Sequence, residues 1–213
     1  MKVLLINGSP HSGGCTYTAL HLVAEALNEE KIDTEIVQIT SVPVNGCIDC
    51  KKCFGKEKPE CILNDQVNEL AEKLAEADGL VIGSPVYFGA PNGKLIAILN
   101  RLFRIFRTST GGKLAGKVGA AVVSARRSGN TASWDVLNKY FGSSCMPVVP
   151  SQQYWNMVHG YTPEDVMQDL EGVQTMRTLG KNMAWLLRCI KYGEANGITL
   201  PEPEKREKTN FIR

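Results

Sequence analysis

Four cysteines lie close together in one segment of the chain. Cys47, Cys50, Cys53 and Cys61 follow the spacing C-x2-C-x2-C-x7-C. Cysteines at such short intervals can direct four sulfurs to one iron-sulfur cluster or one metal ion. Zinc is one such ion, because four thiolates also suit a closed tetrahedral site. The segment therefore predicts a metal centre, but the spacing alone does not identify the metal.

A second motif is a loop rich in glycine, serine and threonine at residues 7–18, NGSPHSGGCTYT, directly after an apolar run. At a helix N-terminus such a loop directs backbone N–H groups, hydroxyls and the positive end of the helix dipole to one point, where phosphate fits. It has neither the lysine of the nucleoside-triphosphate loop nor the dinucleotide spacing G-x-G-x-x-G. Neutral donors alone can hold the monophosphate of FMN. The alternative is structural: Ser9 and Thr16 cap a helix and the glycines only turn the chain.

A third motif, residues 84–91, reads SPVYFGAP and follows another apolar run. The rings of Tyr87 and Phe88 can stack on a flat heterocycle, while Gly89 leaves backbone N–H groups free to approach its rim. We interpret this loop as the cradle of such a heterocycle. The alternative is that both aromatic residues belong to the core.

These loops need ordered elements to position them, and short apolar runs alternate with longer stretches of helical period. Such alternation is typical of a parallel sheet covered by helices on both faces. The expected strands are Val3 to Asn7, Thr34 to Ile39, Gly79 to Ser84, Val118 to Ser124 and Pro147 to Pro150. The expected helices are Thr16 to Glu29, Asp65 to Ala77, Asn92 to Phe106, Thr131 to Phe141 and roughly Pro163 to Tyr192. The last of them has one apolar stripe that should pack on the core.

Length and composition predict one ordinary globular unit. The 213 residues suffice for one sizeable core, so we expect a single domain over residues 1–200 and a polar C-terminal arm over 201–213. No run reaches the roughly eighteen apolar residues of a membrane span, and the first apolar run is too short for a signal peptide. The seven cysteines, an odd number, fit a reducing cytoplasm better than a secreted disulfide framework.

Charge is unevenly distributed although the net charge is only +2. Between Asp78 and Asp135 there is no acidic residue. The cations of this half are Lys94, Arg101, Arg104, Arg107, Lys113, Lys117, Arg126 and Arg127. They predict a positive face that either is merely solvated or attracts an anionic cofactor, substrate or acidic protein. No recognition motif accompanies the charge, so nucleic acid is not an expected partner.

The motifs together resemble the NADPH-dependent FMN reductase family. The resemblance rests on G-S-P-x-x-x-G-x-T from Gly8 to Thr16, on Ser84 to Gly89, and on Lys94 to Arg101. It implies a flavodoxin-like, doubly wound α/β fold with a five-stranded parallel sheet of order 2-1-3-4-5, plus the long C-terminal helix, and FMN at the carboxyl ends of the strands.

The resemblance also implies which residues contact FMN. The phosphate ligands would be Ser9, His11, Cys15, Thr16 and Thr18. The ring contacts would be Pro85, Val86, Tyr87, Phe88, Gly89, Ser124, Arg126, Gly129 and Asn130. The family more often has arginine and asparagine at positions 11 and 15, where backbone N–H groups can still serve. An arginine near the pyrimidine edge would stabilise the anionic reduced flavin, although a surface role explains Arg126 equally well.

Across the cysteine segment the chain resembles the iron-sulfur flavoprotein branch of this family, which implies a four-iron, four-sulfur cluster held by the four clustered cysteines. Zinc, or no metal and free thiols or a disulfide, are the alternatives. The branch implies an FMN-dependent oxidoreductase that passes electrons from a reduced carrier such as ferredoxin to an acceptor.

Two other functions remain open from the sequence. One is an NAD(P)H-dependent FMN, quinone or small-molecule reductase without a cluster, and the other is a non-catalytic electron carrier or cysteine-based redox sensor. No residues are arranged as a general acid, base or nucleophile, so we expect no catalytic side chain of that kind. The resemblance further implies a homo-oligomer, a dimer or tetramer.

Overall fold

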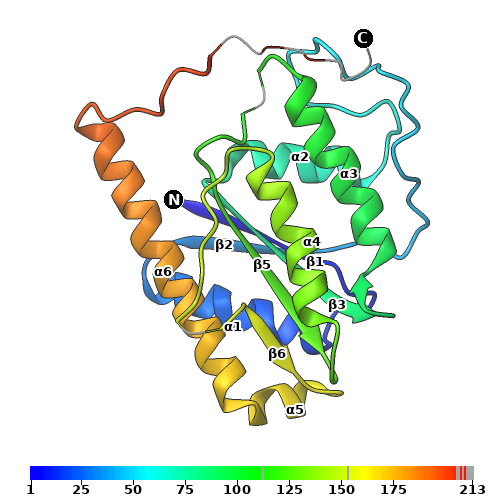
Figure 1. Ribbon diagram of the computed structural model, residues 1–213, viewed down its shortest axis with the longest axis vertical. Coiled ribbons are helices and arrows are strands. Elements are labelled where there is room, and N and C mark those ends of the chain that lie inside the picture. Colours follow the sequence, from blue (N-terminus) through cyan, green and yellow to red (C-terminus); the bar gives the residue numbers. More distant parts are fainter. Residues whose placement is uncertain (112, 153, 205–206, 208, 210–213) are drawn as a thin grey trace.

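The apolar runs of the sequence form the strands of one sheet in the computed structural model, which describes residues 1–111, 113–152, 154–204, 207 and 209 (Figure 1). The strands are β1 Lys2–Asn7, β2 Asp33–Gln38, β3 Gly79–Tyr87, β4 Ala90–Pro91, β5 Val118–Ala125 and β6 Met157–His159. The helices are α1 Cys15–Glu29, α2 Gln66–Glu76, α3 Gly93–Thr108, α4 Asn130–Gly142, α5 Pro163–Gln168 and α6 Leu170–Ala195. The expected arm over residues 201–213 lies partly outside the described residues.

Five strands follow the order β2-β1-β3-β5-β6, and each neighbouring pair is parallel. With β5 and β6 as the fourth and fifth parallel strands, this is the predicted flavodoxin-like order 2-1-3-4-5, and the predicted fold class is confirmed. The short β4 pairs antiparallel with the end of β3. The strand order reverses between β1 and β3, so the loops leaving their carboxyl ends turn to opposite faces and leave a crevice between them.

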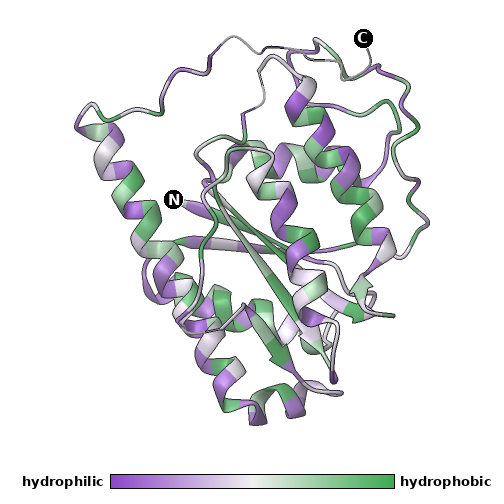
Figure 2. Ribbon diagram, viewed as in Figure 1, coloured by the Kyte–Doolittle hydropathy of each residue, from purple (hydrophilic) through white to green (hydrophobic). Residues whose placement is uncertain are grey.

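Alternating side chains of the strands build one apolar core on each face of the sheet. Leu4 and Ile6 of β1 pack in the core that includes α2, α3 and α4. Val3 and Leu5 pack in the core that includes α1 and α6. Figure 2 shows β5 and β6 in white to green, and β2 partly in purple, between helices of mixed character. A parallel sheet buried on both faces explains why the strands read as continuous apolar runs.

The fifth parallel strand lies later in the chain than predicted. Over the predicted range Pro147 to Pro150, pairing with the sheet is confined to one isolated bridge between Val148 and Gly119, whose hydrogen bonds come from the carbonyl of Pro147 and the N–H of Val149. Proline has no N–H to donate to a ladder, so the two prolines prevent a continuous strand there. The paired strand is β6, whose Met157 aligns with Val123 of β5.

The single helix expected from Pro163 to Tyr192 is two helices. Thr162 and Asp165 form a capping box that starts α5, as the proline at its first position favours. Asp169 ends α5 with a non-helical ψ of 76°, and its carboxylate accepts from the N–H of Gly172 at 3.0 Å to start α6. In the part of the chain that the structure describes, no helix, α6 included, is long and apolar enough to cross a membrane.

Candidate functional site

The loop after β1 is held by side chains from two strands. Asn7, the last residue of β1, accepts from the N–H of Ser9 at 3.1 Å and donates to the carbonyl of His11 at 3.3 Å. Its amide also donates to Gln38 Oε1 at 2.6 Å, and Gln38 Nε2 donates to the Ser9 carbonyl at 2.5 Å. Ser9 Oγ accepts from the N–H of His11 at 3.1 Å, and the His11 side chain is exposed. Hydrogen bonds from within the protein therefore hold the shape of the loop.

Of the three helices that begin at the predicted flavin loops, α1 and α4 have no side-chain cap at their N-terminus. α1 follows Gly14 and α4 follows Gly129. The other four helices each begin at a side chain that accepts a hydrogen bond from the first turn: Asp65, Asn92, Thr162 and Asp169. First-turn N–H groups lack partners within a helix, so those of α1 are available to an external acceptor, whereas in α4 the N–H of Thr131 already donates to Asn130 Oδ1 at 3.2 Å. The alternative that Ser9 and Thr16 cap α1 is wrong.

Hydroxyl groups connect the first loop to the loop after β5. Thr16 Oγ1 lies 2.7 Å from Ser124 Oγ, and both side chains are buried. Thr18 Oγ1 donates to the carbonyl of Gly14 at 3.3 Å. The thiol of Cys15 instead donates to the carbonyl of Gly160 at 3.7 Å, and burial raises its pKa. A role for Cys15 at a phosphate therefore rests on its backbone N–H.

The predicted ring loop is the hairpin of β3 and β4. Its turn residues Phe88 and Gly89 have φ values of 51° and 76°, as a tight type I′ turn requires. Phe88 is fully exposed and Tyr87 is 44% exposed. The alternative that these two aromatic residues belong to the core is therefore wrong, and their rings are available to a ligand or to another protein surface.

The loop after β5 packs directly on this hairpin. Ser124 aligns with Pro85 in the sheet, so the two loops leave it side by side. Gly129 has a φ of 86°, and a Cβ there would lie 2.8 Å from both Gly89 Cα and Val86 Cγ1. Only glycine fits this position without displacing the hairpin. Arg126, between Ser124 and Gly129, is exposed.

Beside this loop lies a cavity of about 200 Å³ that sequence patterns did not assign to the site. Its wall includes Tyr154, Trp155 and His159. The His159 ring lies between two polar groups: its Nε2 is 2.9 Å from Asn130 Nδ2, and its Nδ1 is 3.5 Å from the Asp169 carboxylate. An aromatic wall with one such histidine suits a small flat molecule.

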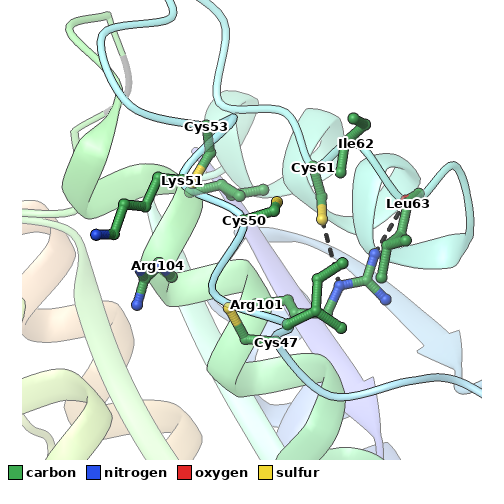
Figure 3. Close-up of a pocket in the computed structure, with 11 residues that line it drawn as sticks. Cys47, Cys50, Lys51, Cys53, Cys61, Ile62, Leu63, Arg101 and Arg104 are labelled. Atoms are coloured by element: carbon green, nitrogen blue, oxygen red, sulfur yellow. Dashed lines mark hydrogen bonds between the residues drawn. The ribbon is translucent and has the colours of Figure 1, made fainter.

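The four clustered cysteines line one cavity beside α3 (Figure 3). Their loop joins β2 to α2 and runs along α3 (Figure 1). Cys53 is buried and Cys61 half-buried, whereas Cys47 and Cys50 are exposed. The cavity measures about 20 Å³, room for about one water molecule. Its other lining residues are Ile48, Lys51, Ile62, Leu63, Arg101, Arg104 and Ile105.

Arg101 is the largest fully buried side chain of the described residues, and it organises this cavity. It forms a bidentate pair with Asp65, at 2.6 Å and 2.9 Å. Its Nη2 donates to the carbonyl of Leu63 at 2.9 Å and its Nη1 to that of Asn45 at 3.3 Å. Its Nε donates to Cys61 Sγ at 3.4 Å, one of the dashed lines in Figure 3. All three guanidinium nitrogens are therefore used.

A second guanidinium lies on the other side of the cavity. Arg104 pairs with Asp49 and lies over the ring of Phe54, 5.5 Å from its centroid. Asp49 and Lys51 have φ values of 50° and 60°, which residues other than glycine rarely adopt. Backbone strain of this kind concentrates at functional sites, and here it bends the chain around Cys50.

The cavity residues fit a metal group by their chemistry, because four thiol groups line one cavity. Within residues 1–111, 113–152 and 154–204, no three histidine, cysteine or acidic side chains converge on a metal position. All four cysteines line the same cavity, Cys53 and Cys61 within its wall and Cys47 and Cys50 on its exposed side. The neighbouring guanidiniums offset the negative charge that four thiolates bring.

The burial of Arg101 corrects the positive face predicted from the sequence. Arg101 is 1% exposed and is paired with Asp65, so it adds no charge to the surface. The sequence contained only a weak signal for the pairing of Arg101 with Asp65, namely that Asp65 lies where a helix begins. Nothing in the sequence indicated that Asn7 and Gln38 order the first loop.

Comparison with known proteins decides the family. The family described as NADPH-dependent FMN reductase matches residues 1–160. The chain belongs to this family. Members of the family are FMN-dependent oxidoreductases, and this chain is one of them.

Curated relatives match this chain along most of its length. An iron-sulfur flavoprotein of Methanocaldococcus jannaschii is 36% identical over 197 residues, which cover 90% of this chain and 100% of the relative. An iron-sulfur flavoprotein of Methanosarcina thermophila is 28% identical over 193 residues, covering 90% and 97%. The chain therefore matches relatives of its own length within the FMN reductase family.

Solved structures show the same fold at low sequence identity. RosB with a bound 8-demethyl-8-formylriboflavin-5′-phosphate intermediate has a TM-score of 0.67 at 17% identity, covering 100% of this chain and 93% of that one. An NAD(P)H:quinone oxidoreductase of Methanothermobacter marburgensis has a TM-score of 0.63 at 16% identity, covering 86% and 98%. These likenesses establish the flavodoxin-like fold.

Proposed function

We propose that this FMN-dependent oxidoreductase carries a four-iron, four-sulfur cluster on Cys47, Cys50, Cys53 and Cys61 and passes electrons between a reduced donor, such as a ferredoxin, and an acceptor. The observation that carries the proposal is the single cavity that all four cysteines line beside two guanidiniums of α3. The names of the archaeal relatives support it. When both groups are bound, FMN accepts or donates one or two electrons and the cluster one at a time.

The flavin would lie at the carboxyl ends of β1, β3 and β5. The uncapped N-terminus of α1, with Ser9, Thr16 and Thr18, holds the phosphate by backbone N–H groups and hydroxyls. The hairpin from Pro85 to Gly89 and the residues Ser124, Gly129 and Asn130 bound the ring. Arg126 is exposed and would contact the ring from solvent, and His11 and Cys15 would contribute backbone N–H groups.

Helix α3 links the two sites. Asn92 caps α3 at the flavin hairpin, and its backbone N–H donates to Ser84 Oγ at 3.0 Å. From Gly93 to Arg101 the helix rises about 12 Å, at 1.5 Å per residue. Lys94, in the first turn of α3, donates to the carbonyls of Thr40 and Ser41 at 3.0 Å and fixes the start of the cysteine loop. A rigid element thus sets the separation of flavin and cluster.

A cluster-free NAD(P)H-dependent FMN or quinone reductase is the second candidate function. The cavity beside Asn130 and His159 favours it, because this cavity would bring a small flat acceptor next to the ring loops. A cysteine-based redox sensor is the remaining alternative.

One purification distinguishes these functions. For the native chain prepared without oxygen, we expect one FMN per chain by mass determination of the released cofactor, and about four iron and four acid-labile sulfide per chain. FMN without iron, even after anaerobic reconstitution, would favour the cluster-free reductase. FAD as the released cofactor would contradict the phosphate site, because no loop for a second phosphate and adenine is evident in the sequence.

We further propose that the chain forms a homo-oligomer in a reducing cytoplasm. The exposed rings of Tyr87 and Phe88 at the hairpin, and of Trp185 and Tyr192 on α6, are apolar surfaces that a second copy can cover. All seven cysteines are free thiols, which suits a reducing compartment. Multi-angle light scattering at micromolar concentration is expected to give a dimer or tetramer; a stable monomer would refute the assembly.

A further inference from the structure

The hydrogen bonds of Arg101 join the two ends of the cysteine segment. Asn45, two residues before Cys47, and Leu63, two residues after Cys61, both direct their carbonyl groups at the same guanidinium. These partners lie 56 and 38 positions from Arg101 along the chain. One buried side chain therefore fixes where the segment meets α3 and where it leaves.

Asp65 balances the charge of Arg101 and also caps α2. Asp65 accepts both Nη groups of Arg101, and its carboxylate also accepts from the N–H of Val67 to cap α2. A planar guanidinium can engage a carboxylate with two nitrogens and still direct its third nitrogen elsewhere, which a lysine ammonium cannot do. In this site the third nitrogen, Nε, points at Cys61 Sγ.

We propose that Arg101 is a positioning residue of the metal site, an inference that rests on the proposed cluster. It holds Cys61 in place as a ligand before the metal arrives, and its Nε–H donates to that sulfur in the loaded protein. A hydrogen bond to a ligand sulfur disperses the extra negative charge of the reduced cluster and raises its reduction potential. Arg101 therefore sets both how firmly the cluster is held and how readily it accepts an electron.

A purely structural role would have a different signature. The ion pair with Asp65 and the carbonyl contacts would stabilise the fold whether or not Nε meets a sulfur. Loss of such a role would lower thermal stability and FMN content together, because α3 also supports the flavin hairpin. The potential of the cluster in protein that still loads is the quantity that separates the two roles.

The test compares Arg101→Lys with Arg107→Lys in the full-length protein. Arg101→Lys keeps the positive charge and an ion-pair partner for Asp65 but removes the directed Nε–H. Arg107, on the same helix, is exposed and is not part of the cysteine cavity, so Arg107→Lys is the matched control. The measurements are iron, sulfide and FMN per chain, and the midpoint potential of the cluster from a redox titration followed by electron paramagnetic resonance.

For Arg101→Lys we expect the amount of iron that stays bound in the presence of a chelator to fall about tenfold or more. Losses of this size are typical when a residue that hydrogen-bonds to a metal ligand is replaced. In the fraction that still loads, the equilibrium constant for one-electron reduction should fall about threefold to tenfold; tenfold corresponds to about 59 mV toward more negative potential. FMN content should stay near the native value. Arg107→Lys should match the native protein in all these measurements.

Hydrogen exchange keeps the inference testable when a variant does not load. In metal-free protein, Arg101→Lys should speed exchange in residues 45–63 while the first loop after β1 is unchanged. Native iron retention and potential in Arg101→Lys would overturn the inference, as would equal exchange in the two variants. Failure of the native chain to take up any iron would instead refute the proposed cluster, and exchange alone would then decide whether Arg101 holds the segment.

Discussion

Serine at any one of Cys47, Cys50, Cys53 or Cys61 is expected to lower the iron content by more than tenfold while most FMN remains bound. All four sulfurs would bind one charged cluster, so loss of one ligand destabilises the whole group. The flavin loops follow β1, β3 and β5, whereas the cysteine loop follows β2 and lies along α3. The two sites share no residue, so the cluster can be lost without dismantling the flavin site.

Iron and sulfide per chain in the four single variants, purified without oxygen, measure this effect. Cys145→Ser and Cys189→Ser are matched controls, because both thiols are exposed and neither lines the cavity. The controls should keep native iron. Full iron in any one of the four variants would exclude that cysteine as a ligand, and equal loss of iron and FMN would mean that the loop supports the flavin site after all.

Replacement of Thr16 by leucine is expected to weaken FMN binding by about a hundredfold or more. The change removes a hydroxyl that would serve the phosphate, and a hydrogen bond to a charged group contributes about 1.5–3 kcal/mol, or about tenfold to a hundredfold in affinity. It also leaves the buried Ser124 Oγ without its Thr16 partner and places a larger side chain where the first and third loops meet.

Fluorescence titration of the flavin-free protein with FMN gives the dissociation constants. Thr16→Val removes the hydroxyl at nearly constant volume and should give an intermediate loss. Thr34→Val, which removes a hydroxyl that donates to Asn28 outside the site, should bind FMN normally. Unchanged affinity in Thr16→Leu would refute the phosphate assignment, and melting curves identify a variant that fails to fold.

The features predictable from the sequence are those set by local pattern. The first four parallel strands follow from apolar runs and their spacing, and the strand order was implied by the family resemblance. The loops near Gly14 and Gly89 were recognisable because glycines at the ends of buried strands indicate turns and close backbone approach. The family resemblance supplied the assignment of those loops to FMN.

The features missed from the sequence depend on distant partners or on competing local signals. Arg101 and Arg104 look like an exposed cationic stripe on α3, and only the loop that folds over Arg101 from 36 or more positions away buries it. Pro147 and Pro150 lie in an apolar run but cannot complete a ladder. Asp169 lies within a continuous helical period, yet it ends α5. Its backbone is not helical there, and its carboxylate accepts a hydrogen bond from the first turn of α6.

The place of Arg101 in the chain has a consequence for biosynthesis. Cys61 precedes Arg101 by 40 residues, so a ribosome that adds about 5–20 residues per second completes the cysteine segment roughly 2–8 s before the guanidinium that anchors it exists. During that interval the four thiols are unsupported on a nascent chain. For the proposed cluster, productive insertion is therefore expected only after α3 has been synthesised and has docked.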